Sequence, residues 1–379
     1  MKILQVGKFF PPQVGGMETF LYDLTNELNK KGIQTDVVCS NINSSTKIEN
    51  INNYKVVRVA NIGIIASTSI SPIMIKCLRE ISNNYDIVHI HHPNPTANLA
   101  LMLSRFKGKV LIHWHSDIVK QRVLLRFYKP FLLRMLKRAD RIIATSPPYA
   151  EHSEFLKKFM HKVNVIPFGI DINKMNNIDK DVVKQIKARY LNKKIIFSLG
   201  RLTYYKGFDY LIESAKYIPD NYVVLIGGDG ELKRKLELMI NRNKLTKKVF
   251  LLGNISHGEV YSYFEASDLF VLPSIERSEA FGIVQIEAMY FKKPIVSTNI
   301  IGSGVPWVNE NGITGYVVEP RNPEKIAEAI VKILDNEDTY NSFSNNAYKR
   351  FVEKFHINVA VKKIIDLYNE LTILNLHQS

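Results

Sequence analysis

The sequence predicts an α/β protein made of two doubly wound domains with parallel sheets. The length of 379 residues exceeds one comfortable hydrophobic core, since domains average roughly 150 residues. Short β-branched runs alternate with longer amphipathic segments almost throughout, which is typical of repeated βαβ units. A polar passage rich in Asn and Lys, residues 170–192, interrupts this alternation, and we place the boundary between the domains near its start.

The first domain is expected to begin with a strand followed by a helix over Met17–Lys31. The end of this helix, Lys30-Lys31-Gly32, has the basic residues and the glycine of a helix C-terminus. A final amphipathic segment, about residues 356–374, is expected to pack back on this domain. The first domain therefore comprises residues 1–169 with about 356–379, and its expected strands are Lys2–Val6, Thr35–Cys39, Val56–Ala60, Ile87–Ile90, Val110–His113, Arg141–Thr145 and Val163–Ile166.

The second domain, residues 170–355, repeats the alternation of strands and helices. Every expected strand is a short run dominated by β-branched and aromatic residues, and a helical segment separates each from the next. The expected strands are Ile195–Leu199, Tyr222–Ile226, Val249–Leu252, Leu269–Leu272, Pro294–Ser297 and Gly315–Val318.

The composition excludes several classes of protein. An apolar fraction of 46% and a charged fraction of 23% are ordinary for folded domains and argue against disorder. Two cysteines, Cys39 and Cys77, are too few for a disulfide framework or a zinc site, so a reducing cytosolic compartment is expected. The first residues are too short an apolar run for a signal peptide, and no run reaches the roughly 18 apolar residues of a membrane span.

The net charge of +15 favours contact with something anionic, which includes nucleic acid, phosphorylated ligands and acidic membranes. The sequence contains no basic motif interleaved with aromatics and no Cys/His finger, so no nucleic-acid partner is expected. The densest basic stretch runs from Lys120 to Arg141 and carries eight cations against one acid, Asp140. With apolar residues between the charges, it suits an anionic bilayer surface or, alternatively, a sheet-covering helix with a solvated face. Pro130 is expected to kink or split it.

Four glycine-bearing turns follow expected strands, and each is either a ligand contact or a tight structural connection. The first, residues 7–16, ends in Gly15-Gly16 at the start of a helix, where free N–H groups suit a phosphate. The second places Arg201 and Lys206 just past a strand, where such a pair suits a diphosphate, with an exposed basic loop as the alternative. The third, residues 227–231, is explained at least as well by structural glycines.

The fourth turn carries two carboxylates eight positions apart, Glu279 and Glu287, with Gly282 and the start of a helix between them. The N-terminus of this helix offers N–H groups suited to a pyrophosphate. Glu279 and Glu287 are each able to accept hydrogen bonds from hydroxyl groups. The alternative is a capping role for Glu279 and a solvated position for Glu287, which the apolar neighbours of Glu287 argue against.

Taken together, these motifs resemble glycosyltransferase family four, whose GT-B fold has two facing Rossmann-like domains. The likeness covers essentially the whole chain. It rests on motifs spread over both halves: Gly15-Gly16-Met17-Glu18, His113-Trp114-His115-Ser116-Asp117, Ile166-Pro167-Phe168-Gly169-Ile170-Asp171, Gly200-Arg201 with Lys206-Gly207, Gly228-Asp229-Gly230 and the Glu279/Glu287 pair.

The resemblance implies a role for each site residue. Arg201 and Lys206 would neutralise the diphosphate leaving group, Glu279 would hold the donor sugar and Glu287 the ribose. Backbone N–H groups would contact the donor at Gly15, Gly16, Phe281, Gly282 and Ile283, while Asn254 and Ile255 would lie against the base. His115 would line the cleft near the sugar, with a buried structural histidine as the alternative.

The resemblance also implies retention of anomeric configuration by front-face attack, in which the leaving phosphate takes the acceptor's proton. The Glu pair is therefore not interpreted as a glycosidase acid and nucleophile. His89, His91 and His92 are interpreted as cleft wall rather than a metal site. Neither a metal nor another cofactor is expected.

The variant motifs His113–Lys120 and Gly302–Asn309 look like those of bacterial surface-polysaccharide enzymes. That likeness favours mannosyl transfer from GDP-mannose to a saccharide or lipid-linked saccharide acceptor, at the inner face of the cytoplasmic membrane. A UDP-hexose or UDP-N-acetylhexosamine donor is the close alternative. A nucleotide-sugar epimerase and a non-catalytic binder of anionic surfaces stay open, although neither explains Arg201, Lys206, Glu279 and Glu287 together.

Overall fold

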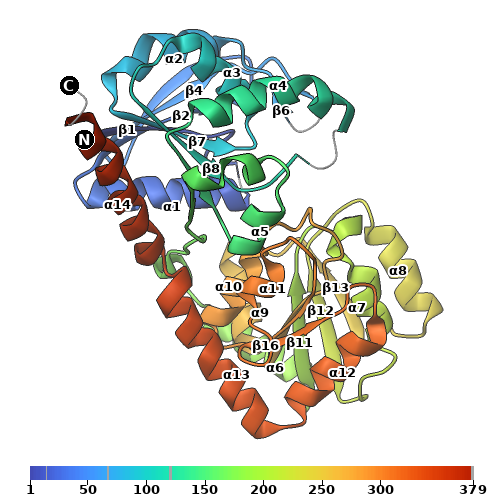
Figure 1. The fold of residues 1–379 in the computed structure, drawn as a ribbon. Helices are drawn as coiled ribbons and strands as arrows, with labels where there is room; N and C mark the ends of the chain where they lie inside the picture. Colours follow the sequence, from blue (N-terminus) through green and yellow to red (C-terminus); the bar gives the residue numbers. More distant parts are fainter. Residues whose placement is uncertain (14, 66–67, 119–121, 377–379) are drawn as a thin grey trace. The chain divides into compact units, whose positions relative to one another are not determined.

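The computed structural model describes residues 1–13, 15–65, 68–118 and 122–376, and it divides into two compact units. Unit 1 comprises Met1–Gly169 and Ile357–Ser379, and unit 2 comprises Ile170–His356. Each unit is an α/β domain with helices packed around one main sheet (Figure 1). Among the described helices, none combines the length and the apolar character needed to cross a bilayer.

The sheet of unit 1 has eight strands in the order β10-β9-β8-β7-β1-β2-β4-β3. All neighbours are parallel except β3 and β4, which pair antiparallel at one edge. The strands are β1 (Lys2–Val6), β2 (Gln34–Ser40), β3 (Lys47–Ile51), β4 (Tyr54–Val59), β7 (Ile87–His92), β8 (Lys109–Trp114), β9 (Arg141–Ala144) and β10 (Val163–Val165), and β5 (Ile64–Ile65) pairs with β6 (Thr68–Ser69) separately.

The helices of unit 1 are held by one apolar face each. On α1, buried Phe20, Leu21, Leu24 and Leu28 recur at helical spacing. The α-helices are α1 (Gly16–Lys30), α2 (Ile73–Ile81), α3 (Pro95–Ser104), α4 (Arg122–Arg138), α5 (Pro147–His152) and α14 (Ile357–Leu376), with short 3₁₀ turns η1 (Ser82–Asn84) and η2 (Leu156–Lys162).

Of the two outcomes expected at Pro130, a kink or a split, the split does not occur, because α4 runs through Pro130 as one helix. Proline removes one backbone hydrogen bond and crowds the preceding turn. The apolar face just beyond it compensates, since Leu132, Met135 and Leu136 are fully buried. Lys120, which opens the basic stretch of the sequence, lies outside the described residues.

The sheet of unit 2 is parallel throughout, in the order β13-β12-β11-β14-β15-β16. Numbered within the unit, this order is 3-2-1-4-5-6, which reverses direction between β11 and β14. Ligands of such sheets bind beyond the carboxyl ends of the strands at this reversal. The strands are β11 (Lys194–Leu199), β12 (Tyr222–Gly227), β13 (Val249–Gly253), β14 (Leu269–Leu272), β15 (Ile295–Thr298) and β16 (Gly315–Val318).

Helices of unit 2 cover this sheet, and a core that includes Leu211, Val224, Leu236, Val271 and Ile330 joins the two layers. The α-helices are α6 (Lys180–Arg189), α7 (Phe208–Ser214), α8 (Lys233–Arg242), α9 (His257–Ala266), α10 (Ile283–Tyr290), α11 (Val305–Val308), α12 (Pro323–Leu334) and α13 (Glu337–Arg350). Shorter turns are η3 (Ile172–Lys174), η4 (Tyr204–Lys206) and the π-helical η5 (Phe351–Phe355).

The C-terminal helix α14 belongs to unit 1, as the sequence predicts, and lies beside α1 (Figure 1). A Cβ on Gly169 would stand 2.7 Å from the Cα of Ile357, so this glycine allows the start of α14 to approach closely. Farther along α14, the buried hydroxyl of Tyr368 accepts a hydrogen bond of 3.1 Å from Nε2 of Gln5 on β1.

Candidate functional site

Two loops meet at the reversal point of the unit 2 sheet. The loop after β11 holds Arg201 and Lys206, and the loop after β14 holds Glu279. They are tied together by the N–H of Ile275, which donates to the carbonyl of Tyr205 at 2.8 Å. Gly207 has a φ of +66°, and a Cβ there would lie 2.2 Å from the carbonyl oxygen of Pro273. Only glycine permits this approach.

Lys206 and Glu279, predicted separately for the diphosphate and the sugar, form an ion pair. The Nζ of Lys206 lies 2.6 Å from Oε2 of Glu279, and each side chain is only 12% exposed. The hydroxyl of Ser274 donates to the same oxygen at 3.0 Å. Burial alone would lower the pKa of Lys206, but the negative charge of Glu279 outweighs it and raises the pKa above its usual value. Lys206 therefore keeps its positive charge beside the carboxylate of Glu279.

Arg201 contrasts with Lys206 although both stand in the same loop. Its side chain is exposed, and its guanidinium makes no hydrogen bond or ion pair with any residue in the described part of the chain. The positive charge of Arg201 lowers the pKa of Lys206 slightly against the effect of Glu279, so the two cations lie near enough to repel each other. The planar guanidinium of Arg201 and the compact ammonium of Lys206 together suit the negative charge of a diphosphate.

Helix α10 follows Glu279 and begins at Ile283, with Gly282 as its N-cap at a φ of +74°. Its first N–H groups lack acceptors within the helix, and the helix dipole adds partial positive charge at this end. The side chain of Phe281 is buried and packs on Trp307 and Phe355. Phe281 can therefore offer a ligand its backbone but not its ring.

Glu287 lies on α10 within an apolar setting. Its carboxyl is partly buried and forms no hydrogen bond or ion pair with any residue that the structure describes. Burial raises the pKa of Glu287 to about 7, because the charged form loses hydration without gaining a partner. An uncompensated carboxyl of this kind is typical of functional sites.

The third part of this edge is the turn after β13, where the sequence predicts the base contact. The N–H of Gly228 donates to the carbonyl of Gly253 at 2.7 Å, so the ends of β12 and β13 lie together. A Cβ on Gly227 would stand 2.5 Å from Cδ1 of Ile255, which places that side chain against the backbone of β12. Asn254 is exposed beside it. The structure thus gathers Asn254 and Ile255 at the same edge of the sheet as Arg201.

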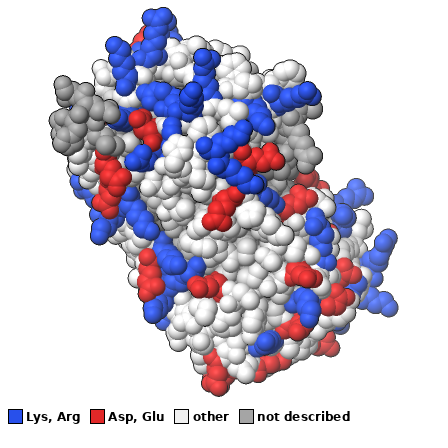
Figure 2. Space-filling view, in the orientation of Figure 1, with Lys and Arg blue, Asp and Glu red and all other residues white. Residues whose placement is uncertain are grey.

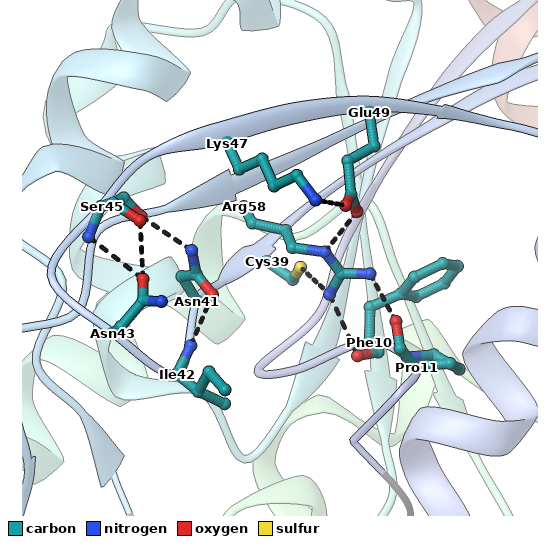
Figure 3. A network of polar contacts seen from close by, with 10 residues as sticks. All are labelled: Phe10, Pro11, Cys39, Asn41, Ile42, Asn43, Ser45, Lys47, Glu49 and Arg58. Carbon is teal, nitrogen blue, oxygen red and sulfur yellow. Dashed lines mark hydrogen bonds and ion pairs between the residues drawn. The ribbon is translucent and has the colours of Figure 1, made fainter.

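In unit 1, the glycine-bearing loop after β1 is anchored by Arg58 of β4, a residue that the sequence did not single out. Its guanidinium donates to the carbonyl of Phe10 at 3.1 Å and to that of Pro11 (Figure 3). Its Nε pairs with Glu49 at 2.7 Å, and Lys47 binds the other oxygen of that carboxylate (Figure 3). The buried guanidinium of Arg58 thus fixes the backbone of this loop at Phe10 and Pro11.

Gly15 and Gly16 lie at the start of α1, as expected, whereas Val14 falls outside the described residues. The carboxylate of Glu18 folds over Gly15, and a Cβ on Gly15 would stand 2.3 Å from its Oε2. Burial lowers the pKa of Lys8 and raises that of Glu18, while their opposite charges partly offset both shifts. A side chain at position 15 would therefore require the flexible carboxylate of Glu18 to move aside.

His89, His91 and His92 correct the cleft-wall expectation, because they lie in the interior of unit 1 and do not form a surface wall. Gln5, His89, His91 and His113 share one face across the neighbouring strands β1, β7 and β8, as the strand register shows. His115 continues this face, and its ring stacks on those of His113 and Phe168. The imidazoles of His89, His91, His92, His113 and His115 are at most 3% exposed.

Burial keeps these imidazoles neutral. It lowers the pKa of His91 and of His92 to about 3, and it lowers those of His89, His113 and His115 well below the usual value, with smaller effects from neighbouring imidazoles. His91, His113 and His115 each bring a ring nitrogen within 4.8 Å of the others. Both nitrogens of His91 are already hydrogen bonded, to His115 at 2.8 Å and to Gln5 at 2.9 Å. A metal would have to displace one of these bonds.

Lys and Arg side chains gather at the top of the view, where helices α2–α4 lie, and α2 and α4 carry them while α3 has none (Figure 2). Phe127 and Phe131 of α4 are exposed, Phe127 by 74%. A cavity of about 350 Å³ opens between α3 and α4. Its lining combines apolar residues, which include Phe106 and Met135, with the cations Arg105, Arg134, Lys137 and Arg138. Exposed aromatics beside clustered cations suit an anionic lipid surface.

Comparison with known proteins adds to this geometry. Residues 14–174 match the model of Glycosyltransferase Family 4, and residues 179–350 match that of Glycosyl transferases group 1. The O-antigen chain mannosyltransferase C of Escherichia coli is 31% identical, over 98% of this chain and 99% of the relative. The D-rhamnosyltransferase WbpZ of Pseudomonas aeruginosa is 29% identical, over 94% and 92%. HepE of Anabaena, solved with UDP and glucose, shares the fold with a TM-score of 0.76 at 19% identity, over 97% of this chain and 99% of that one.

Proposed function

The chain belongs to glycosyltransferase family 4, and we propose that it transfers a hexose with retention of configuration to a saccharide or lipid-linked saccharide in surface polysaccharide synthesis. The proposed donor is GDP-mannose, because a mannosyltransferase is 31% identical over nearly the full length of both chains. A UDP-hexose or UDP-N-acetylhexosamine donor is the alternative outcome of the test below. Either donor is a sugar joined to a nucleoside diphosphate, which unit 2 is built to bind.

The observation that carries this proposal is the Lys206–Glu279 pair beside Arg201 at the reversal point of the unit 2 sheet. In the proposal Lys206, Arg201 and the N-terminus of α10 stabilise the negative charge that develops on the leaving diphosphate. These groups, rather than a metal ion, meet that charge. Glu279 holds hydroxyls of the donor sugar, and its pairing with Lys206 keeps its carboxylate oriented.

The transfer itself follows a front-face course in this proposal. As the bond between the sugar and the diphosphate breaks, an acceptor hydroxyl attacks from the same side, and the leaving phosphate takes its proton. Glu279 acts by position and charge and not as a nucleophile, because its carboxylate is engaged by Lys206 and Ser274. Removing one such contact from a transition state typically costs about 10²–10³ in rate.

The remaining predicted residues complete the donor and acceptor contacts. Glu287 binds the ribose, since its carboxyl has no other partner among the described residues. Asn254 and Ile255 lie against the base, and the backbones of Phe281, Gly282 and Ile283 meet the sugar and phosphate. Gly15 and Gly16 offer N–H groups to the diphosphate, and His115 lies near the transferred sugar.

The enzyme is proposed to attach peripherally to the inner face of the cytoplasmic membrane through the basic surface of helices α2 and α4. Exposed Phe127 and Phe131 would enter the headgroup region, while the cations beside the cavity between α3 and α4 meet anionic lipid. Each Lys or Arg near such a surface contributes about 1 kcal/mol. Attachment would bring the enzyme to a lipid-linked acceptor.

The test is a thermal-shift panel with GDP, UDP, ADP and TDP, each with and without EDTA, followed by product analysis. A ligand that binds the folded protein alone stabilises it by RT ln(1 + [L]/Kd). A selective shift with GDP that survives EDTA is expected, and a UDP response would replace the donor assignment. No shift with any nucleotide would overturn the proposal, and an epimerised sugar without transfer would identify an epimerase.

A further inference from the structure

A chain of hydrogen bonds links the C-terminal helix to His115 through the interior of unit 1. His115 Nε2 lies 2.8 Å from His91 Nδ1, and His91 Nε2 lies 2.9 Å from Oε1 of Gln5. The amide nitrogen of Gln5 donates to the hydroxyl of Tyr368 at 3.1 Å, and that hydroxyl lies 2.6 Å from Nδ1 of His89. All five side chains are buried, and none of the roles assigned above uses Gln5, His89 or Tyr368.

The orientation of Gln5 fixes where every proton in this chain stands. Because Oε1 of Gln5 only accepts, the nitrogen facing it, Nε2 of His91, must carry hydrogen. A neutral imidazole has one N–H, so Nδ1 of His91 is bare and must accept from Nε2–H of His115. The same rule then leaves Nδ1 of His115 without hydrogen. His115 is therefore the Nε2–H tautomer.

At the other end of the hydrogen-bond chain, Tyr368 and His89 follow the same donor-to-acceptor direction. The hydroxyl of Tyr368 accepts from Gln5, so its own hydrogen is free to point at Nδ1 of His89. Each member thus donates to the next, from His115 through His91, Gln5 and Tyr368 to His89. The polarity of the chain is uniform, and it requires every imidazole in it to be neutral, as their lowered pKa values indicate.

Nδ1 of His115 is the acceptor left over at one end. It is buried and meets no hydrogen-bond partner among the described residues. An unpartnered buried acceptor is unfavourable unless something else supplies a donor. A sugar offers hydroxyl groups, which are donors of the required kind.

Resting on the proposed function, in which His115 lies near the transferred sugar, we propose that Gln5, His91 and Tyr368 are positioning residues. They hold His115 as the Nε2–H tautomer, so that its bare Nδ1 accepts a hydrogen bond from a substrate hydroxyl. The reversed order of protons would need the amide of Gln5 turned over. It would place a hydrogen on Nδ1 of His115 and make this atom a donor.

The direct test is ¹⁵N NMR of histidine-labelled protein near pH 7.5, with the His115 signals identified by their loss in His115→Gln. Wild type is expected to show hydrogen on Nε2 and none on Nδ1. Gln5→Met removes the acceptor for His91 and is expected to give a mixture of tautomers at His115. A proton on Nδ1 in wild type, or an unchanged tautomer in Gln5→Met, would overturn the proposal.

A kinetic test separates positioning from support of the fold. Gln5→Met and Tyr368→Phe are expected to lower kcat by about ten- to a hundredfold, the usual effect of losing a group that orients a ligand. Their nucleotide affinity should stay as in wild type, because unit 2 is untouched. Tyr222→Phe is the matched control, since it deletes a buried tyrosine hydroxyl bonded to Asp335 in unit 2.

The two tests fail separately. If wild type shows no transfer and no nucleotide binding, the proposed function fails, while the NMR result still decides the proton order. If wild type is active and Tyr368→Phe loses no more kcat than Tyr222→Phe, the positioning role is refuted and the proposed function stands. Circular dichroism and thermal unfolding confirm that each variant is folded before it is compared.

Discussion

The carboxyl edges of the two sheets are built from opposite kinds of polar group. In unit 1 this edge is filled by stacked imidazoles, all buried and neutral. In unit 2 the corresponding edge holds the Lys206–Glu279 ion pair, an exposed Arg201 and the partly buried Glu287. Neutral groups are far cheaper to bury than charges, so they can form an interior. The charged groups of unit 2 lie instead at the carboxyl edge of its sheet, where Arg201 is exposed.

The largest expected effect is a different response of the two units to acid. Folded His91 has a pKa of about 3, and an unfolded histidine has one of about 6.5. Its contribution to stability is complete above pH 6.5 and is lost as the pH falls toward 3, because the unfolded chain then binds the extra proton. At pH 4 this amounts to about 3 kcal/mol for His91 alone. Four further imidazoles of unit 1 act in the same direction.

Each unit contains one of the two tryptophans, which makes this difference measurable. Trp114 stacks on His92 in unit 1, and Trp307 lies in unit 2. Fluorescence of Trp307→Phe follows unit 1, and that of Trp114→Phe follows unit 2. The denaturant midpoint of unit 1 is expected to fall steeply between pH 7 and pH 4.5. A midpoint for Trp114 that does not change over this range would contradict the neutral imidazole interior.

The second expected effect separates activity from stability in unit 2. Arg201→Ala should lower kcat/KM by about 10²–10³, because it removes a charge that stabilises the leaving diphosphate. The melting temperature should hardly change, since the exposed guanidinium has no partner among the described residues. Steady-state transfer assays and calorimetry measure the two quantities. Arg234→Ala, a surface arginine of α8, is the control, and equal activity in the two variants would contradict the site.

The third expected effect is a loss of stability at high pH, whereas the imidazoles of unit 1 cause a loss at low pH. The pKa of folded Glu287 is about 7, above the unfolded value of 4.5. Stability from this group is complete below pH 4.5 and is lost as the pH rises through 7, at a cost on the order of 3 kcal/mol. Glu287→Gln should therefore stabilise unit 2 at pH 8 and leave it nearly unchanged at pH 4.5.

Glu287→Gln should also weaken nucleotide binding, since in the proposed site the carboxylate accepts from two ribose hydroxyls and an amide cannot replace it in that role. Thermal shifts with the preferred nucleoside diphosphate, at both pH values, measure this loss. A variant that is stabilised at pH 8 and binds nucleotide as well as wild type would remove Glu287 from the donor site.

The smallest expected effect concerns the outer surfaces of the two units. Phe127→Ser should reduce binding to vesicles that contain anionic lipid several-fold, because it removes an apolar group available to enter the headgroup region. Leu238→Ser, an equally conspicuous exposed residue on α8 of unit 2, is the control. Co-sedimentation at low and moderate salt measures both. Equal binding by the two variants would contradict attachment through α4.

Sequence patterns predicted the parts of the fold that depend on local preference. The strands rich in β-branched residues appear close to their expected positions, and the units divide between Gly169 and Ile170, where the polar passage begins. Strand β3 was not predicted because Lys47–Ile51 is mostly polar and pairs only at an edge. Its order comes from β4 and from the Arg58–Glu49 pair, which no local pattern encodes.

The site could be predicted only as separate pieces. Lys206 and Glu279 were each singled out, but their pairing depends on β11 and β14 lying side by side, 73 positions apart in sequence. The spacing His89-x-His91 and His113-x-His115 does place these rings on one face of a strand. Whether that face is covered depends on Phe20, Phe168 and Tyr368, which arrive from distant segments. The cleft-wall interpretation failed for this reason.

Helix α14 gives the chain an order of completion during synthesis. Gln5 and His89 emerge early from the ribosome, whereas Tyr368 is translated only after the whole of unit 2. Unit 2 is one continuous segment, so its chain is completely synthesised before that of unit 1. Until α14 has been made, the face of α1 that meets α14 stays uncovered. A chain that stops before residue 357 would carry a complete unit 2 and an incomplete unit 1. Such a product is recognisable to chaperones and proteases by the apolar surface that α14 would have covered.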